Sequence, residues 1–381
     1  METASVEPSR RLWKAVLLSL MAASCPATAS VAGTGSQSKA GTVDAAALVE
    51  TSVPASGDTA DSIRERLRNL PGHRASVALV LGGGGARGAA HVGVLKVLER
   101  EGIPIDLVVG TSMGSVVGGL YAAGVPVPSI EERFIKGGLM RAFLTVPLAV
   151  RIVVTPIFDI PRLVGVKRLD GMYAGGRFAK FVDNCLPKDG HEISQFRTPF
   201  AAVALNLLDG KVYTVTKGEF GRTIQASSAV PVLRKPVLID GRLFVDGGVT
   251  ANLPVTEARQ LGADIVVAVD VDEQFEPVSI NSFKESGSVA HRVMTLHLAR
   301  VDEQQRHTAD IVIHPPVNGI GLISTKTSDL KTAVAAGESA AQASVPELKR
   351  LLEERGVPCL HESTALNDGA ESSHSLGSQK D

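Results

Sequence analysis

The sequence predicts an α/β fold, because apolar runs that suit buried strands alternate with helical patterns and because glycines cluster where strands meet helices. Residues 76–81 form a continuous apolar run that ends in glycines, which is typical of a strand buried on both faces of a parallel sheet. Residues 87–101 carry apolar side chains at helical spacing and stop at Gly102, so they predict a helix. The next strand is expected at 105–109, and the small-residue run 112–123 predicts the helix after it. This order predicts a right-handed βαβ unit.

The segment 125–195 is more irregular, because prolines interrupt its apolar runs. It is expected to form either a lid or ordinary core packing at one edge of the sheet. Within it, the apolar stretch 143–166, followed by Lys167 and Arg168, is expected to rest on a lipid interface, with a domain edge as the alternative. Its prolines and Arg151 exclude one long membrane-spanning helix.

The remaining core alternates strands with turns and ends in a helical segment. Apolar or alternating runs predict strands at 200–205, 211–216, 236–239 and 265–271. The Asp240-Gly241 dipeptide, which favours a type I′ turn, predicts a hairpin that ends at Asp246-Gly247-Gly248. Residues 328–355 are expected to form one helix or a helix pair.

The N-terminal residues are predicted to be a targeting segment rather than part of the fold. Arg10, Arg11 and Lys14 precede a short apolar run at 15–23, and small residues follow, which is the order of a secretory signal peptide. We therefore expect a signal peptide over residues 1–32 and a protein exported to the periplasm or cell envelope.

A lipid anchor is a second interpretation of the same segment. Ala22-Ala23-Ser24-Cys25 resembles a bacterial lipoprotein box, with Cys25 as the lipidated residue, but Ala22 stands where Leu is usual. Downstream, the sequence predicts a linker over 33–74, in which a charged stretch at 61–68 has helical character, then a single domain over 75–358 and a disordered tail over 359–381.

Charge and composition narrow the function. The chain has 381 residues, with 39 Lys and Arg against 40 Asp and Glu, so its net charge is -1. This balance provides no long-range field to attract a polyanion, and no nucleic-acid partner is expected.

The motif Gly110-Thr111-Ser112-Met113-Gly114 fits G-x-S-x-G and falls between an apolar strand and a helix. This is the context of a nucleophile elbow, in which a Cβ at either flanking glycine would clash and the turn lifts the serine hydroxyl clear of the sheet. A tight strand-to-helix turn with an incidental capping serine is the alternative.

A second glycine motif, Gly83-Gly84-Gly85-Ala86-Arg87-Gly88, also follows a strand and opens a helix, so its N–H groups can face an anion. A dinucleotide site would need an acidic residue at the end of the next strand, where Ser112 lies instead, and a P-loop would need Gly-Lys-Ser/Thr. An oxyanion hole beside a nucleophile elbow explains both motifs.

A serine nucleophile needs a base. His91 is expected to be a packed helix residue, although other histidines, including His291, His297 and His314, stay open as bases. Asp246 ends a strand and is followed by two glycines, and an aspartate in a dehydrated cleft can accept a serine proton directly.

Taken in this order, the glycine loop with its basic residue, the G-x-S-x-G motif and the Asp-Gly-Gly turn resemble the patatin-like phospholipase family. The resemblance covers about residues 75–345 and includes the run 225–231 and the Asn252-Leu253-Pro254 run. It departs at 231–234, where family members commonly have Pro-Gly and an aromatic residue, and this departure concerns the acyl pocket.

The resemblance implies a three-layer α/β/α fold with a mainly parallel central sheet. It implies the following roles: Ser112 as nucleophile, Asp246 as base, the amides of Gly83, Gly84 and Gly85 as the oxyanion hole with Arg87 beside it, Gly110 and Gly114 as elbow glycines, and Gly247 and Gly248 as the base turn.

The expected function is lipid acyl hydrolysis of the phospholipase A, lysophospholipase or esterase type, acting at a membrane surface. The alternative is a non-catalytic nucleotide- or anion-binding module that uses the glycine loop. No cofactor or metal is expected, and Asp270 and Asp272 are expected to be solvated rather than to bind a cation.

Overall fold

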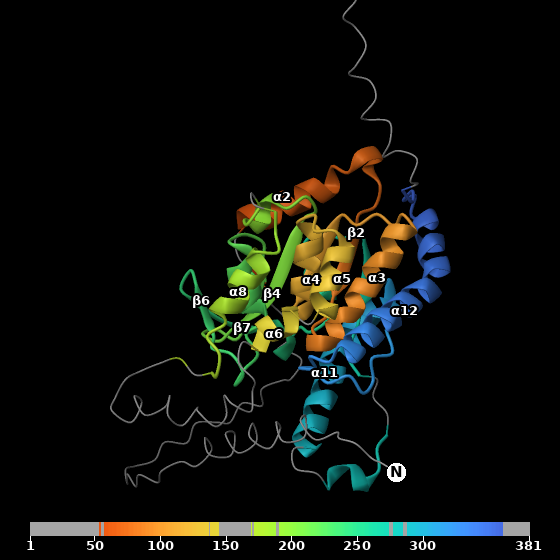
Figure 1. Cartoon of the computed structure of the whole chain (residues 1–381). Helices are drawn as coiled ribbons and strands as arrows, with labels where there is room; N and C mark the ends of the chain where they lie inside the picture. The colour runs from red at the N-terminus through yellow and green to blue at the C-terminus, as the bar shows by residue number, and fades with distance from the viewer. Residues whose placement is uncertain are drawn as a thin grey trace, which may run out of the picture.

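A mixed, mainly parallel sheet is the centre of the fold in the computed structural model (Figure 1), which describes residues 53–54, 57–136, 138–144, 169, 171–187, 190–273, 277–284 and 288–360. Its main path runs β1-β5-β4-β3-β2-β8-β9, and β7 joins β4 to β6. The strands are β1 Val53–Pro54, β2 Val77–Leu81, β3 Leu107–Thr111, β4 Phe200–Asn206, β5 Val212–Val215, β6 Val237–Ile239, β7 Arg242–Asp246, β8 Ile265–Val269 and β9 Ile311–Ile313.

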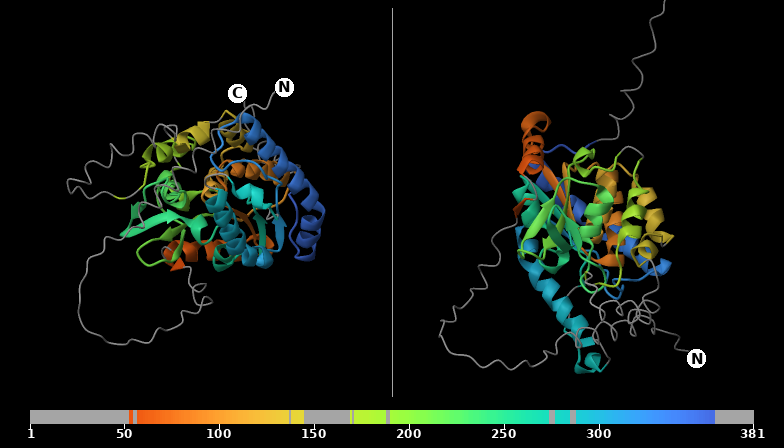
Figure 2. Two further views of the ribbon diagram at one scale, coloured as in Figure 1. Left: turned by 90° about the horizontal axis from the view of Figure 1, so that it is seen from below. Right: turned by 90° about the vertical axis from the view of Figure 1, so that its left-hand side faces the viewer.

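Helices cover both faces of this sheet (Figure 2). The α-helices are α2 Gly57–Arg68, α3 Ala89–Arg100, α4 Met113–Ala122, α5 Val127–Ile135, α6 Gly138–Leu144, α8 Gly176–Asp183, α9 Phe220–Ser227, α10 Val255–Gln260, α11 Ser288–Thr308 and α12 Thr327–Glu354. The short 3-10 helices are η2 Pro71–His73, η3 Gly85–Gly88, η4 Ile193–Gln195, η5 Gly247–Val249 and η6 Ile280–Phe283.

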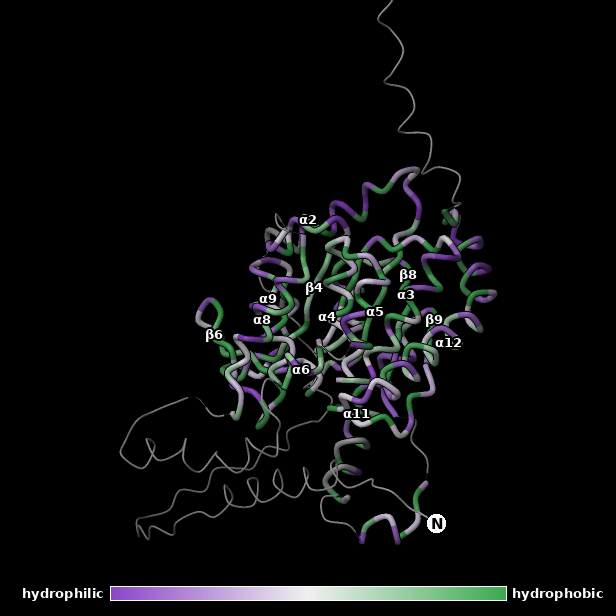
Figure 3. The backbone as a smooth tube through the Cα atoms, viewed as in Figure 1, coloured by the Kyte–Doolittle hydropathy of each residue, from purple (hydrophilic) through white to green (hydrophobic). Residues whose placement is uncertain are grey.

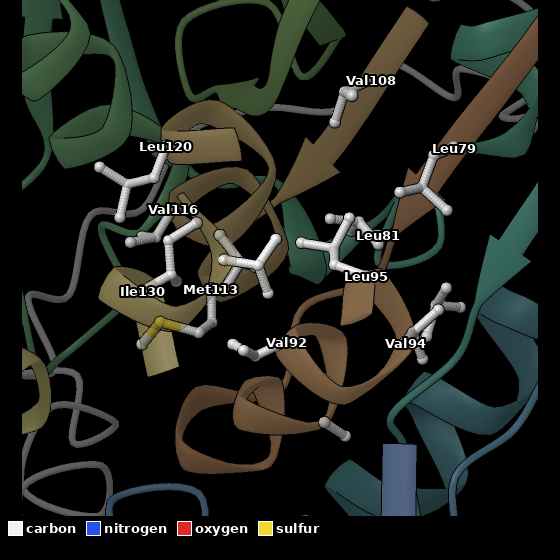
Figure 4. Close-up of a cluster of buried hydrophobic side chains, with 14 of the residues drawn as sticks. Leu79, Leu81, Val92, Val94, Leu95, Val108, Met113, Val116, Leu120 and Ile130 are labelled. Carbon is white, nitrogen blue, oxygen red and sulfur yellow. The ribbon is translucent and has the colours of Figure 1, made fainter. Parts of the chain in front are cut away.

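The pleat of β2 divides the hydrophobic core into two layers, since successive side chains of a strand point to opposite faces. Leu79 and Leu81 pack with α3 and α4 on one face, as Figure 4 shows, whereas Ala78 and Val80 pack with α2 and α10 on the other. Figure 3 shows the central strands as largely hydrophobic, in keeping with their burial on both faces. The predicted three-layer α/β/α architecture is therefore confirmed.

The expected elements of the βαβ unit form within a few residues of their predicted bounds. The hairpin of β6 and β7 also forms, and both Asp240 and Gly241 have positive φ, at 48° and 75°, as a type I′ turn requires. Of the predicted segment 328–355, all residues up to Glu354 fall in one helix, α12, which continues through Pro346.

Part of the predicted linker belongs to the domain instead. Helix α2, within the expected linker 33–74, buries Ala60, Ile63 and Leu67 against the sheet. These three apolar residues stand among charged ones in the sequence, so the buried face of the helix is not apparent from the sequence pattern.

Several expectations fall outside the described residues: the signal peptide over 1–32 with Cys25, most of the irregular stretch between α6 and α8, and the tail from residue 361. The proposed lipid-facing stretch 143–166 begins at Phe143, which is buried and packs edge-on against Phe178. The described parts of 125–195 are α5, α6, α8 and η4 with their flanking turns. Among the described residues, no helix combines the length and hydropathy needed to cross a membrane.

Candidate active site

The register of β4 brings Ser112 and Asp246 together. On one edge of β4, Thr111 of β3 pairs with Val203, and the chain then leaves the sheet at Ser112. Because β5 occupies the opposite edge, β7 takes over the edge that β3 vacates, and its Asp246 pairs with Ala204. Val203 and Ala204 are consecutive in β4, so their partners bring the side chains of Ser112 and Asp246 side by side. These two residues are far apart in the chain.

The turn at Ser112 has the strained geometry of a nucleophile elbow. Ser112 has φ 51° and ψ −119° and caps the N-terminus of α4. A Cβ on Gly110 would lie 2.6 Å from the backbone of Gly114, and a Cβ on Gly114 would overlap the carbonyl oxygen of Leu81. The two flanking glycines are therefore required by space, as the sequence pattern predicts.

Ser112 and Asp246 form a direct hydrogen-bonded pair. The Ser112 Oγ donates to Asp246 Oδ2 at 2.7 Å, and the N–H of Gly248 donates to Asp246 Oδ1 at 2.8 Å. A Cβ on Gly247 would lie 2.6 Å from the carbonyl oxygen of Val203, so this glycine allows β7 to approach β4 closely. The structure thus places both glycines of the base turn in contact with the site.

The carboxylate of Asp246 lies in a dry environment, at 5% exposure. Burial raises the pKa of Asp246 from 3.8 to about 6, while hydrogen bonds from Ser112 and Gly248 and the positive charge of Arg234 act in the opposite direction. At neutral pH the group is ionised and basic enough to accept a proton from a hydroxyl.

Ser227 is a second serine of the site that motif reasoning did not single out. Its Oγ accepts a hydrogen bond from the N–H of Ser112 at 3.0 Å and donates to the carbonyl oxygen of Val203 at 2.7 Å. It therefore ties the elbow to β4. The feature of the sequence that could have identified Ser227 is its position in the run 225–231, which is part of the family resemblance.

The glycine loop lies against Ser112, but only two of its three expected donors are free. The N–H of Gly83 donates to the carbonyl oxygen of Asn252 at 3.2 Å, which corrects its assignment to the oxyanion hole. The N–H groups of Gly84 and Gly85 have no acceptor within the described part of the chain. A Cβ on Gly83 would lie 3.2 Å from Cβ of Ser112, so the loop borders the nucleophile.

Arg87 differs from its expected role. It is 5% exposed, its Nε donates to the carbonyl oxygen of Ile320 at 2.7 Å, and its Nη2 pairs with Glu273 at 2.7 Å. Its charge is therefore neutralised, and it braces the glycine loop rather than adding positive charge to an oxyanion hole.

His91 does not act on Ser112 in this geometry. It is fully buried, and its Nε2 lies 2.8 Å from the carbonyl oxygen of Gly82, so it braces the start of the glycine loop. Burial lowers the pKa of His91 to about 4, which keeps the ring neutral. Among the described residues, no histidine bonds to the Ser112 hydroxyl, and Asp246 is its partner.

The acidic residues after β8 are buried, contrary to the expectation that Asp270 and Asp272 are solvated. Their carboxylates and that of Asp302 lie within 4.8 Å of one another, a donor set that suits a cation. Each already has protein partners, however: Asn252 donates to Asp302 at 2.9 Å and to Asp272 at 3.2 Å, and Arg306 pairs with Asp270 at 2.7 Å. This cluster therefore supports the glycine loop, because the backbone carbonyl oxygen of Asn252 also accepts a hydrogen bond from the N–H of Gly83.

The part of the chain that contains Ser112 and Asp246 is similar to known proteins. Residues 79–259 match the family model described as Patatin-like phospholipase. The chain is 35% identical over 203 residues to "Patatin-like phospholipase domain-containing protein 6" of Homo sapiens, an alignment that covers 53% of this chain and 14% of that relative. It is 35% identical over 209 residues to "Lysophospholipase NTE1" of Kluyveromyces lactis, covering 54% of this chain and 13% of that relative.

The chain thus spans about one seventh of the length of these curated relatives. Among solved structures, the "Human GIVD cytosolic phospholipase A2 in complex with Methyl gamma-Linolenyl Fluorophosphonate" aligns with a TM-score of 0.41 and 12% identity, over 78% of this chain and 63% of that one.

Proposed function

We propose that this protein, whose residues 79–259 match the model of the patatin-like phospholipase family, belongs to that family and is a lipid acyl hydrolase that works through a Ser112–Asp246 dyad. The observation that carries the proposal is the 2.7 Å hydrogen bond from Ser112 Oγ to a buried carboxylate whose pKa is raised to about 6. No histidine is needed for the first proton transfer in this arrangement.

The proposed mechanism is a two-step acyl transfer. Asp246 Oδ2 takes the proton of Ser112 as its Oγ attacks the ester carbonyl, and the free N–H groups of Gly84 and Gly85 hold the oxyanion. The proton then passes from Asp246 to the alcohol or lysolipid that leaves, and an acyl ester remains on Ser112. Water then attacks this ester and gives a proton to Asp246, the bond between the acyl group and Ser112 Oγ breaks, the fatty acid leaves, and Asp246 returns the proton to Ser112 Oγ.

The competing nucleotide- or anion-binding module fits the glycine loop less well. A phosphate cradle uses several successive free N–H groups, but Gly83, Ala86 and Arg87 already donate to Asn252, Leu322 and Gly84. Two free donors, on the residues that follow the glycine bordering Ser112, suit a single oxyanion.

The test is labelling by a fluorophosphonate probe together with release of fatty acid from a lysophospholipid. We expect labelling of the wild type and none of Ser112→Ala, and a loss of kcat of about 10³-fold or more in Ser112→Ala and Asp246→Asn. His91→Ala should lose much less, because His91 acts only through the loop. Equal labelling of Ser112→Ala, or a rise in melting temperature with ATP or NADH without ester turnover, contradicts the proposal.

A lysophospholipid is the favoured substrate class, since the relative from Kluyveromyces lactis carries the name lysophospholipase. We further propose a bacterial, exported protein, on the signal-peptide pattern of residues 1–32. N-terminal sequencing of envelope-associated protein checks this: cleavage before Cys25 or near residue 32 supports export, and an intact N-terminus in the cytoplasm opposes it.

A membrane surface is the proposed place of work, because the substrate class is lipid and because one described edge of the molecule exposes apolar side chains around η6 and α11.

A further inference from the structure

Arg234 is the largest of the fully buried side chains among the described residues, at 2% exposure. Its guanidinium carbon lies 4.1 Å from the ring centre of Phe143 and 4.5 Å from that of Phe178. Its Nη2 donates to the carbonyl oxygen of Phe143 at 2.7 Å. Its Nε and Nη1 have no hydrogen-bond partner, and in the described part of the chain no carboxylate forms an ion pair with it.

Such an arginine is costly to keep without a function, because a buried cation needs compensation from an anion or from hydrogen bonds. The two aromatic faces supply only part of it. Three N–H groups, one on Nε and two on Nη1, remain without an acceptor. Nη2 carries a second N–H besides the one that donates to Phe143, and with an N–H on Nε or Nη1 it completes a fork that can bind carboxylate or phosphate oxygens in a bidentate manner.

The turn that precedes Arg234 in the chain is strained. Val232 has φ 69°, which is unfavourable for a β-branched residue, and the N–H of Leu233 donates to the carbonyl oxygen of Pro231 at 2.8 Å, closing a γ-turn. Strain of this kind persists where the surrounding structure holds it and is concentrated at functional sites. At these positions the family resemblance leads one to expect glycine and an aromatic residue, so Val232 and Arg234 distinguish this chain.

Arg234 lies beside the dyad. The N–H of Asp246 donates to the carbonyl oxygen of Ala229, and the N–H of Arg234 donates to that of Val230, so the segment that carries the arginine is hydrogen-bonded to the residue that carries the base. The charges of Arg234 and Asp246 are close enough that each stabilises the other. An anion at Arg234 would therefore lie next to the scissile ester.

We propose that Arg234 forms an anion subsite beside the dyad that binds the phosphate group of a lysophospholipid substrate. This inference rests on the proposed function and adds a substrate preference to it. A phosphodiester is the natural occupant, since in a lysophospholipid it is separated from the ester by the short glycerol backbone. The carboxylate of the released fatty acid shares the same chemistry, and the experiment separates the two sources.

The experiment compares kcat/KM for 1-oleoyl lysophosphatidylcholine with kcat/KM for 1-oleoylglycerol, both delivered in the same neutral mixed micelles. The ratio of these two kcat/KM values reports the contribution of the phosphate group alone, because any change in the basicity of Asp246 affects both substrates alike. We expect Arg234→Met to lower the ratio by about tenfold or more, mainly through KM of the phospholipid, as loss of a charge-assisted contact implies. Arg222→Met is the matched control, since Arg222 is exposed on α9 and donates to Leu238 O.

A second measurement separates product from substrate. If oleate inhibits 1-oleoylglycerol hydrolysis less strongly in Arg234→Met while the ratio is unchanged, the subsite binds the product carboxylate and the phosphate assignment is wrong. If neither quantity changes, Arg234 binds no anion. If the wild type hydrolyses neither ester, the proposed function itself fails.

Stability supplies a readout besides activity. Because a buried cation without an ion pair and with N–H groups that lack an acceptor opposes folding, Arg234→Phe should melt at the same temperature as the wild type or higher. A markedly lower melting temperature would assign Arg234 a structural role and overturn the inference.

Discussion

Asp246 is held in surroundings that oppose its charge, and this has a measurable consequence for stability. Its carboxyl group has a pKa of 3.8 in the unfolded chain and about 6 in the folded protein, because burial disfavours the ionised form. The native state therefore binds the proton more tightly than the unfolded state does. The stability that this provides is complete below pH about 4 and is lost as the pH rises through about 6.

We predict that Asp246→Asn becomes more stabilising, relative to the wild type, as the pH rises from 4 to 8. The asparagine cannot ionise, so it avoids a cost of about 3 kcal/mol that a shift of about two pKa units implies. Melting temperatures of both proteins across this range test it. A difference that does not change with pH would mean that Asp246 titrates normally. The same pKa implies that wild-type kcat/KM increases with pH through about 6.

At this scale, local motifs predicted some residues and not others. Ser112 and Asp246 stand at strand ends next to glycines that their own turns require, so each residue could be singled out from a short segment. Their pairing could not be predicted in this way, because it depends on the register of β3 and β7 on β4. The hydrogen bonds of Gly83 and Arg87 could not, because their partners, Asn252 and Glu273, come from distant parts of the chain. Whether a backbone N–H is free depends on those partners and not on the glycine motif.

At the scale of elements, α3 and α12 pack with their backbones in contact. A Cβ on Gly93 would overlap the carbonyl oxygen of Val334, and a Cβ on Gly337 would overlap that of Ala90. Two glycines in facing helices thus set the distance between them. Helix α3 follows directly from the glycine loop, so this contact also fixes the element that extends from the candidate oxyanion hole.

We predict that Gly337→Ala destabilises the protein, although alanine favours a helix by about 1 kcal/mol over glycine. The added methyl group has no space, and overpacking costs about 1–3 kcal/mol. Urea unfolding measures the net effect. Gly138→Ala is the matched control in α6, because its nearest atom would be an ordinary 3.6 Å away, and it should be neutral or stabilising. Equal behaviour of the two variants would show that α12 shifts freely on α3.

Elements with strong local signals were predictable, and those defined by tertiary contacts were not. The run from β2 to α4 has unbroken apolar strands and glycine stops, and its predicted bounds hold to within two residues. The sequence predicts a linker where α2 packs on the sheet, because only Ala60, Ile63 and Leu67 mark the buried face of this helix among charged neighbours. Strand β9, of three residues, is too short for a period-2 pattern and depends on pairing with β8.

At the scale of the whole molecule, α11 extends beyond the body that contains the sheet, as Figures 1 and 2 show. Large apolar side chains are exposed just before η6, on η6 and on the first turns of α11: Val278 at 45%, Ile280 at 83%, Phe283 at 37%, Val289 at 58% and Val293 at 59%. We call this set the apolar arm. Several such residues within so short a segment are typical of a surface that meets an apolar partner.

The base of the apolar arm is connected to the candidate active site. The ring of His297 hydrogen-bonds to the carbonyl oxygen of Val249, in the base turn that follows Asp246. Further along α11, Asp302 accepts from the N–H of Leu253 at 2.9 Å. A lipid surface in contact with the arm would therefore lie on the side of the molecule where Asp246 and its turn are found, which suits an enzyme that takes its substrate from that surface.

We predict that Ile280→Asp combined with Phe283→Asp weakens binding to phospholipid vesicles by at least about tenfold, because each side chain contributes about 1.5–3 kcal/mol when it leaves water. Co-sedimentation with vesicles measures binding.

The matched control, Leu207→Asp combined with Leu208→Asp, changes two side chains at 50% and 65% exposure after β4 and should bind as the wild type does. Hydrolysis of a soluble short-chain ester should be equal in all three proteins, since neither pair contacts the dyad. Equal loss of binding in both double variants would mean that apolar exposure in general drives adsorption, and unchanged binding in both would assign the apolar arm to a protein partner or a second copy of the chain. Only a loss confined to the arm variant connects the lipid surface to the helix that lies against the base turn.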